Sequence, residues 1–173
     1  PATVDLVFGG PGVRRQWLDW GLFHVKHEYL GLQRRYVAAL RQRNACLKAI
    51  GAGKLPTQAL MPWTTELADC GERIGEMRRD YLGALAEPFA GALHELSIGI
   101  RIELLYRQGW PEGTALDNQL SETAAREVKS GVTGVGPHRA DVEMSFAGLP
   151  CASTLSQKQA KIFCRRLLCF QIG

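Results

Sequence analysis

The chain has 173 residues, 46% of them hydrophobic, and a formal net charge of +4 at pH 7. This length supports one sizeable core, or one domain with a protruding arm, and leaves little room for two full domains. No run of 18 or more apolar residues occurs, and the start at Pro1 lacks the pattern of a signal peptide. We therefore expect a cytoplasmic protein. Because the chain begins without Met and stops straight after an apolar helix pattern, we also expect an interior piece of a longer protein.

The positive charge is regional. Residues 1–54 contain nine Lys or Arg against three acidic residues, whereas the remainder of the chain has a net charge of −2. A basic patch of this kind fits binding to a phosphate backbone, although a solvated helix face gives similar runs of charge. Charge alone does not decide between these two interpretations.

The first residues predict a strand followed by a turn. Residues 2–8 mix small and β-branched side chains, as a short strand does. The cluster Gly9–Gly12 then breaks the backbone. Neither this cluster nor the later Gly51–Leu55 completes the G-x-x-x-x-G-K-[ST] spacing of a phosphate-binding loop, so both are expected to be ordinary loops.

The next segments predict an antiparallel helical hairpin. Residues 13–25 form a pattern apolar enough to pack on two sides. The helix expected over His27–Ile50 has one apolar stripe and an otherwise basic surface. A third helix begins near Pro62 and carries an apolar seam, with spacings of three and four, as far as Tyr81. At 1.5 Å per residue, helices of about 20 to 35 residues form an arm on the order of 30 Å or more long.

A small sheet is expected after the hairpin. Ile100–Tyr106 alternates apolar with polar residues, which is the period of a half-buried strand. Residues 114–129 predict a short solvent-facing helix capped by Thr114, and Ala140–Phe146 is the clearest strand in the chain. The expected fold class is α+β, with a long antiparallel helical hairpin as an arm attached to a small sheet with flanking helices.

Polar groups with few structural tasks gather in Gly136–Asp141. Pro137 fixes its own φ and favours an extended residue before it, so His138 and Arg139 are expected to be presented rigidly. Asp141, on the polar face of the strand, is expected to orient Arg139 or to meet water. This group suits an anion, above all a phosphate, although a His-Arg pair is also common in an ordinary exposed turn.

A second polar stretch, Leu155–Gln159, opens the last helix. Ser156 sits where an N-cap belongs, and a cap worth about 1 kcal/mol explains the residue without any ligand. The functional interpretation is that the helix N-terminus offers unpaired amides and a partial positive charge to the terminal phosphate of a nucleotide presented by another subunit. Lys158 adds a cation at this place.

The sequence shows no constellation for metal binding or catalysis. His24 and His27 are three residues apart, but no carboxylate or Cys accompanies them at ligand spacing. The five cysteines include no C-x-x-C pair and are expected to be reduced, mostly buried thiols. No nucleophile has an adjacent base. We therefore expect neither a metal site nor a complete catalytic site in this chain.

Four stretches together resemble RecF, a family of bacterial DNA replication and repair proteins within the ABC/SMC-like ATPases. They are Arg14–Val25 (RRQWLDWGLFHV), Ala39–Asn44 (ALRQRN), Gly136–Asp141 (GPHRAD), and Leu155 and Ser156 with Gln159 and Lys161. The resemblance spans nearly the whole chain. It implies one arm-bearing lobe, with a helical arm over residues 13–96 and the strand-and-helix part of an ATPase head over residues 97–173 together with 2–8.

In this family the motif at Leu155–Gln159 is the ABC signature, which closes over ATP held by the Walker A loop of the opposite subunit. The resemblance thus implies that Leu155, Ser156, Lys158 and Gln159 lie at a nucleotide bound by a second copy. Lys158 stands where the family has Gly, the residue that lets a phosphate approach the backbone. On the ATPase head, the phosphate candidates are His138, Arg139 and Asp141.

The resemblance also implies cofactors and partners. The sequence contains neither a Walker A nor a Walker B motif, so ATP and magnesium are expected only in the complete protein, and neither is expected to bind this piece alone. Intact family members are slow DNA-dependent ATPases of DNA repair, recombination, replication and the SOS response. The expected partners are single-stranded, double-stranded and gapped DNA, RecR-like and RecO-like mediators, and a second copy of the protein when ATP binds. The expected location is the cytoplasm, near the nucleoid.

The leading interpretation is a piece of a RecF-like recombinational repair protein that assists recombinase loading at gaps and stalled forks. Its DNA-contact candidates are Arg34, Arg35, Arg41 and Arg43. The alternative is a catalytically silent module for protein interaction or DNA binding, in which the signature motif has decayed. That alternative is suggested by Lys158 and by the pair Arg165 and Arg166, which interrupts the apolar pattern of the last helix.

Overall fold

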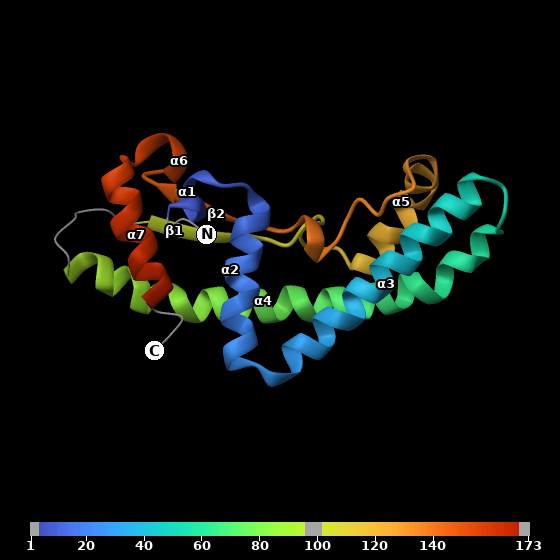
Figure 1. The fold of residues 1–173 in the computed structure, drawn as a ribbon, viewed down its shortest axis with the longest axis horizontal. Helices are drawn as coiled ribbons and strands as arrows, with labels where there is room; N and C mark the ends of the chain where they lie inside the picture. The colour runs from blue at the N-terminus through green and yellow to red at the C-terminus, as the bar shows by residue number, and fades with distance from the viewer. Residues whose placement is uncertain (1–3, 96–101, 170–173) are drawn as a thin grey trace. The chain divides into compact units, whose positions relative to one another are not determined.

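The computed structural model describes residues 4–95 and 102–169, which form two compact units (Figure 1). We call the first the sheet unit; it consists of the residues up to Val25, Met77–Arg107 and the residues from Asp141 onwards. The second, the helical unit, consists of Lys26–Glu76 and Gln108–Ala140. Each unit is described by itself below.

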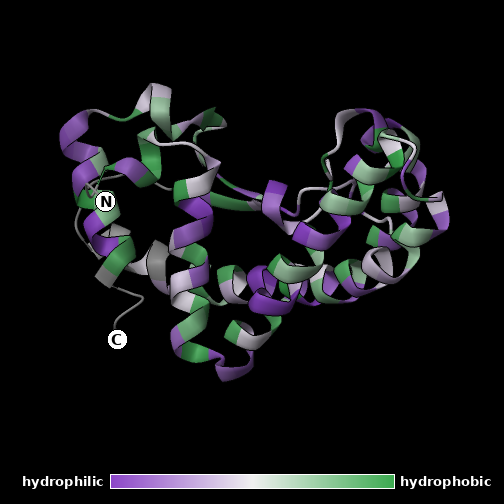
Figure 2. Cartoon of the chain, turned by 45° about the vertical axis from the view of Figure 1, so that its right-hand side comes forward, coloured by the Kyte–Doolittle hydropathy of each residue, from purple (hydrophilic) through white to green (hydrophobic). Residues whose placement is uncertain are grey.

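The helical unit is built on an antiparallel pair of helices. Helix α3 (His27–Gly51) has 25 residues, and α4 (Met61–Glu95) has 35 residues, of which those up to Glu76 belong to this unit (Figure 1). A short 3₁₀ turn, η1 (Thr57–Leu60), precedes α4. Hydrophilic and hydrophobic residues alternate along the helices, as expected for amphipathic helices that bury one stripe (Figure 2). The predicted helical hairpin is therefore confirmed.

Helix α5 (Leu116–Ser130) completes the helical unit and packs against α3. The prediction that Thr114 caps it is wrong: Ala115 takes the N-cap position without a side-chain bond, and the Thr114 hydroxyl instead donates to the Pro111 carbonyl at 2.7 Å. At the other end, Gly131 adopts a left-handed φ of 70° and its N–H donates to the Glu127 carbonyl, which is the usual way for a glycine to end a helix. A second 3₁₀ turn, η2 (Pro137–Arg139), follows.

The sheet unit contains three antiparallel strands in the order β1-β2-β3, namely β1 (Ile102–Arg107), β2 (Asp141–Phe146) and β3 (Leu149–Pro150). Both predicted strands are confirmed where the structure describes them; Ile100 and Arg101 lie outside the described residues. The turn from β2 to β3 places Ala147 at φ 51° and Gly148 at φ 77°, as a two-residue hairpin with the twist of its strands requires.

Helices cover the buried face of this sheet, and their packing corrects the strand prediction for residues 2–8 where the structure describes them; Ala2 and Thr3 lie outside the described residues. Residues Asp5–Phe8 form the short helix α1 rather than a strand, because Leu6 and Val7 are buried where α1 meets α2 (Pro11–Val25), α6 (Cys151–Thr154) and α7 (Gln157–Cys169). Tertiary packing here outweighs the β propensity of the side chains. The predicted glycine turn is shorter than expected, since Pro11 and Gly12 already belong to α2.

Helix α2 packs on one side only, so the prediction of two-sided packing is wrong. Trp17, Leu18 and Leu22 are buried, whereas the side chains of Trp20 and Phe23 are 44% and 47% exposed. The ring of His24 lies between these two exposed rings, with centroids 4.2 Å and 5.2 Å away. Taken together, the helical hairpin and the small sheet with flanking helices confirm the predicted α+β class. Within the described residues, no helix is long and apolar enough to cross a membrane.

Candidate functional site

The start of α7 is closed by a reciprocal pair of side chains. The Ser156 N–H and hydroxyl both donate to Oε1 of Gln159, at 2.9 Å and 2.8 Å, and the Gln159 N–H donates back to the Ser156 hydroxyl at 3.3 Å. This is a capping box, in which a Ser and a Gln three residues later satisfy each other's backbone N–H groups. The S-x-x-Q spacing is visible in the sequence, but our prediction treated Ser156 alone as the cap.

The sequence that follows this helix start is positively charged. No Asp or Glu follows Glu143 in the sequence, while Lys158, Lys161, Arg165 and Arg166 all lie in α7. Ser156 and Lys158 are exposed, and Leu155 is buried and anchors the turn. A solvent-exposed helix N-terminus with cations and without nearby sequence carboxylates fits an anionic ligand such as a phosphate group.

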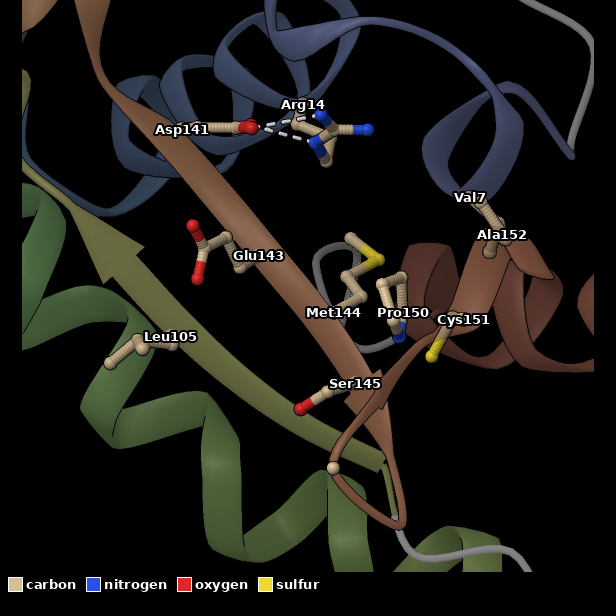
Figure 3. Close-up of a pocket in the computed structure, with 11 residues that line it drawn as sticks. Val7, Arg14, Leu105, Asp141, Glu143, Met144, Ser145, Pro150, Cys151 and Ala152 are labelled. Carbon is tan, nitrogen blue, oxygen red and sulfur yellow. Dashed lines mark hydrogen bonds and ion pairs between the residues drawn. The ribbon is translucent and has the colours of Figure 1, made fainter. Parts of the chain in front are cut away.

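A pocket of about 420 Å³ lies beside the sheet, within the sheet unit (Figure 3). Its polar wall includes Arg14, Asp141 and Glu143, and its apolar wall includes Val7 and Leu105. Figure 3 shows the Arg14 guanidinium directed at the Asp141 carboxylate. Nε and Nη2 of Arg14 donate to the two carboxylate oxygens at 2.7 Å and 2.9 Å.

The prediction for Asp141 is therefore wrong, because this carboxylate pairs with Arg14 instead of orienting Arg139 or meeting water. Its Oδ1 also accepts from the Val142 N–H at 2.8 Å. Arg14 in turn uses its remaining terminal nitrogen, Nη1, to donate to the Gly9 carbonyl at 2.6 Å. The side chains are only 14% and 23% exposed. The pair ties the start of β2 to the beginning of α2, and neither group is left over for a phosphate.

His138 is held inside the helical unit by two partners. One ring nitrogen lies 3.1 Å from the Thr133 carbonyl, which only accepts, so Nε2 carries the proton and donates. The other, Nδ1, then accepts from the hydroxyl of Tyr36 at 2.6 Å. Both nitrogens of His138 are thus committed to the fold, whereas Arg139 is exposed.

Backbone hydrogen bonds hold the turn around His138. Gly136 has φ 127°, a value that favours glycine, and its N–H donates to the Gly109 carbonyl at 3.1 Å. The Arg139 N–H donates to the Gly136 carbonyl at 2.8 Å. These bonds position the half-buried imidazole, whereas the neighbouring guanidinium is exposed.

The basic face of α3 also differs from the prediction, because Arg43 is completely buried. Its Nη1 donates to Glu127 at 2.6 Å and to the Thr133 hydroxyl at 2.8 Å, and its Nη2 donates to the Leu120 carbonyl at 3.2 Å. Glu127 is itself only 2% exposed. A buried charge requires such pairing, so Arg43 is a core residue and is not available to DNA.

Arg35 stays at the surface but has a partner. It makes two bonds to Glu66, at 2.9 Å and 3.1 Å, and this hydrogen bonding holds the pKa of the Glu66 carboxyl below its usual range. Arg34 and Arg41 are exposed and line a groove of about 240 Å³ on α3 together with Gln33, Val37 and Ala38. Of the four predicted DNA contacts, Arg34 and Arg41 are the two that form no ion pair with a carboxylate among the described residues.

The cysteine prediction is confirmed for the side chains that the structure describes. Cys70, Cys151 and Cys164 are buried, Cys46 is half-buried, and all four are free thiols. Burial raises the pKa of Cys151 to about 11 and that of Cys164 to about 12, so both stay protonated and unreactive at neutral pH. Across residues 4–95 and 102–169, no group of three or more His, Cys, Asp or Glu side chains is arranged to hold a metal ion.

Comparison with curated proteins finds relatives that match nearly the whole chain. The chain is 40% identical to the DNA replication and repair protein RecF of Stenotrophomonas maltophilia (strain R551-3). The aligned 164 residues cover 94% of the chain and 44% of the relative. It is 37% identical to RecF of Pseudomonas paraeruginosa (strain DSM 24068 / PA7), again over 94% of the chain and 43% of the relative. The chain therefore spans somewhat less than half the length of these relatives. No family model matches it.

Solved structures agree with the curated relatives. The chain matches the structure of the recombination mediator protein RecF-ATP in the RecFOR pathway with a TM-score of 0.90 and 26% sequence identity. The match covers 99% of the chain and 48% of that protein. The α+β fold seen here is thus the fold of part of an ABC-type ATPase. Across nearly its whole length, the chain is thus similar in sequence and in fold to a part of RecF proteins.

Proposed function

We propose that the whole protein is a RecF-type recombination mediator, which binds ATP and DNA and assists recombinase loading at gaps and stalled forks. The observation that carries the proposal is the match over 99% of the chain to a RecF-ATP structure, together with the curated RecF relatives. The proposal includes a cytoplasmic, nucleoid-associated location, RecR-like and RecO-like partners, and a second copy of the protein that joins when ATP binds.

The residues proposed at the nucleotide are Ser156, Lys158 and Gln159, with Leu155 as the buried anchor of their turn. The exposed Ser156 hydroxyl would exchange its bond to Gln159 for one to a phosphate, which the positive charge of α7 also suits. Lys158 replaces the family's glycine, but its exposed position on the first turn lets it act as a further cation. The ligand proposed at this helix start is the terminal phosphate of ATP, bound together with magnesium.

On the rest of the ATPase head, the proposal narrows to Arg139. His138 and Asp141 already have the partners described above, so we propose that His138 fixes the turn and that Asp141 fixes β2. Arg139 is the exposed member of the three. It is the one that remains suited to meet a phosphate from outside.

The test compares DNA affinity of the whole protein with and without ATP, measured by fluorescence anisotropy on a gapped duplex. ATP is expected to tighten binding at least tenfold, and Ser156→Ala is expected to remove most of that gain. Ser153→Ala is the matched control, because this exposed hydroxyl donates to the Pro150 carbonyl just before the motif and should leave the ATP effect unchanged. Equal DNA affinity with and without ATP in the wild-type protein would overturn the proposed mechanism.

A further inference from the structure

The structure sorts the cations of α3 into two groups. Beyond Glu28, this helix contains five Lys or Arg and no acidic residue. Arg35 is bound to Glu66, and Arg43 is buried against Glu127. The remaining three are Arg34, Arg41 and Lys48, all of them exposed.

These three residues fall on one line along the helix. They follow each other at intervals of seven residues, and an α-helix drifts by only about 20° per seven residues, so the three side chains leave nearly the same face. At 1.5 Å per residue, neighbours are about 10.5 Å apart and the line is about 21 Å long. The sequence prediction missed Lys48 because it grouped residues by charge density and not by face.

The surface beside Arg34 and Arg41 is open and its groove carries no opposing charge, whereas the stem of Lys48 lies against Gly131 at the end of α5. Between Arg34 and Arg41 lies the groove lined also by Gln33, Val37 and Ala38, and none of these five residues is acidic. Val37 is 44% exposed, and Ala38 is small and exposed. A polyanion can therefore approach α3 closely along this face.

We infer that Arg34, Arg41 and Lys48 form a phosphate-contact line for duplex DNA, an inference that rests on the DNA binding proposed above. A duplex carries one negative charge per about 1.7 Å of its axis, so a 21 Å line faces about a dozen phosphates of both strands. Duplex contacts of this kind are to the backbone and carry no sequence preference.

The composition of the face favours duplex over single-stranded DNA. Sequence-tolerant single-strand sites usually add aromatic side chains on which bases stack. The two aromatic residues of α3, Tyr29 and Tyr36, are both only 2% exposed, and the groove contains none. The line thus offers charge without a stacking surface.

The test replaces the three cations by Gln in the whole protein, in the presence of ATP, and measures affinity for a 25-bp duplex between 50 and 300 mM KCl. Each lost phosphate contact lowers the slope of log K against log salt by about 0.9, so the triple variant should lose about 2 to 3 units of slope. Its affinity at low salt should fall more than tenfold. A 25-nucleotide single strand should lose less.

The matched control also removes three exposed cations of the helical unit, by the substitutions Lys54→Gln, Arg73→Gln and Arg126→Gln. It should keep the wild-type slope, and thermal melting should show both triple variants folded.

An unchanged slope in the line variant would overturn the inference while leaving the proposed function standing. The inference would also be overturned if the line variant kept its DNA affinity but lost binding of a RecR-like protein, because the face would then be a protein-binding surface. Absence of ATP-dependent DNA binding in the wild type would count against the proposed function, and the slope measured without ATP would still test the line.

Discussion

Arg43 of the helical unit and Arg14 of the sheet unit serve in opposite ways, although the sheet unit also buries an arginine, Arg78, against Asp19. In the helical unit, Arg43 lies at the centre of the core, is 0% exposed and bonds to side chains from α4, α5 and the segment after α5. In the sheet unit, Arg14 lies at the edge of a pocket and joins β2 to the beginning of α2, partly in contact with solvent. Arg43 satisfies polar groups inside a core, whereas Arg14 joins two elements at the edge of a pocket. The number of arginines in a stretch is thus a poor guide to the surface that faces a nucleic acid.

The largest expected effect is at Arg43. Arg43→Ala leaves Glu127 as an uncompensated buried charge and should lower the free energy of unfolding by about 3–5 kcal/mol, as measured by urea denaturation of the full chain. The double variant Arg43→Met with Glu127→Leu should recover most of this loss, because an apolar pair needs no charge compensation. A loss below about 1 kcal/mol in the single variant would mean that the core does not depend on the pair.

A smaller effect is expected at Arg14. Arg14→Ala removes two charge-assisted bonds to Asp141 and one to the Gly9 carbonyl, and hydrogen bonds to charged groups are typically worth about 1.5–3 kcal/mol. Partial exposure places the expected loss at the lower end of that range. A double-mutant cycle with Asp141→Asn should show coupling between the two residues. Strictly additive losses of stability would show that the Arg14–Asp141 pair does not contribute.

The smallest effect on stability is expected at Arg35, whose pair with Glu66 is exposed. Arg35→Ala should leave the urea midpoint unchanged within error. The visible consequence is electrostatic: the pKa of Glu66, now held below its usual range by hydrogen bonding to Arg35, should rise toward that range. An NMR titration of the Glu66 carboxyl measures it, and an unmoved pKa would show that the pair does not form in solution.

The sequence predicted the long elements well, because their signals are local. The apolar stripe of α3, the seam of α4 and the alternation of β1 and β2 each repeat over enough residues to identify the element. The burial of Arg43 was also visible in principle, since it lies four residues from both Ala39 and Leu47, which are buried. Reading its charge as a sign of exposure caused the error.

The partners of the polar groups were not predictable, because they are far away in the chain. Glu127 is 84 residues from Arg43, and Asp141 is 127 residues from Arg14. No local pattern indicates such pairs. The capping box at Ser156 and Gln159 is the opposite case, since both residues and their spacing are in the sequence. The role of Ser156 at a nucleotide stays a prediction.

One further consequence follows from the register of the sheet. Arg107 at the end of β1 pairs with Asp141 at the start of β2. Residues 108–140 therefore connect two residues that are direct neighbours across the sheet. The pairing of the two strands is therefore set by their own residues, and for a flexible connection a doubled length would cost only about 0.6 kcal/mol of closure entropy. Strand pairing must wait for this long loop to close, which slows folding. Insertions at the exposed loop positions of residues 108–140 would thus be felt in how fast the sheet assembles more than in how stable it is.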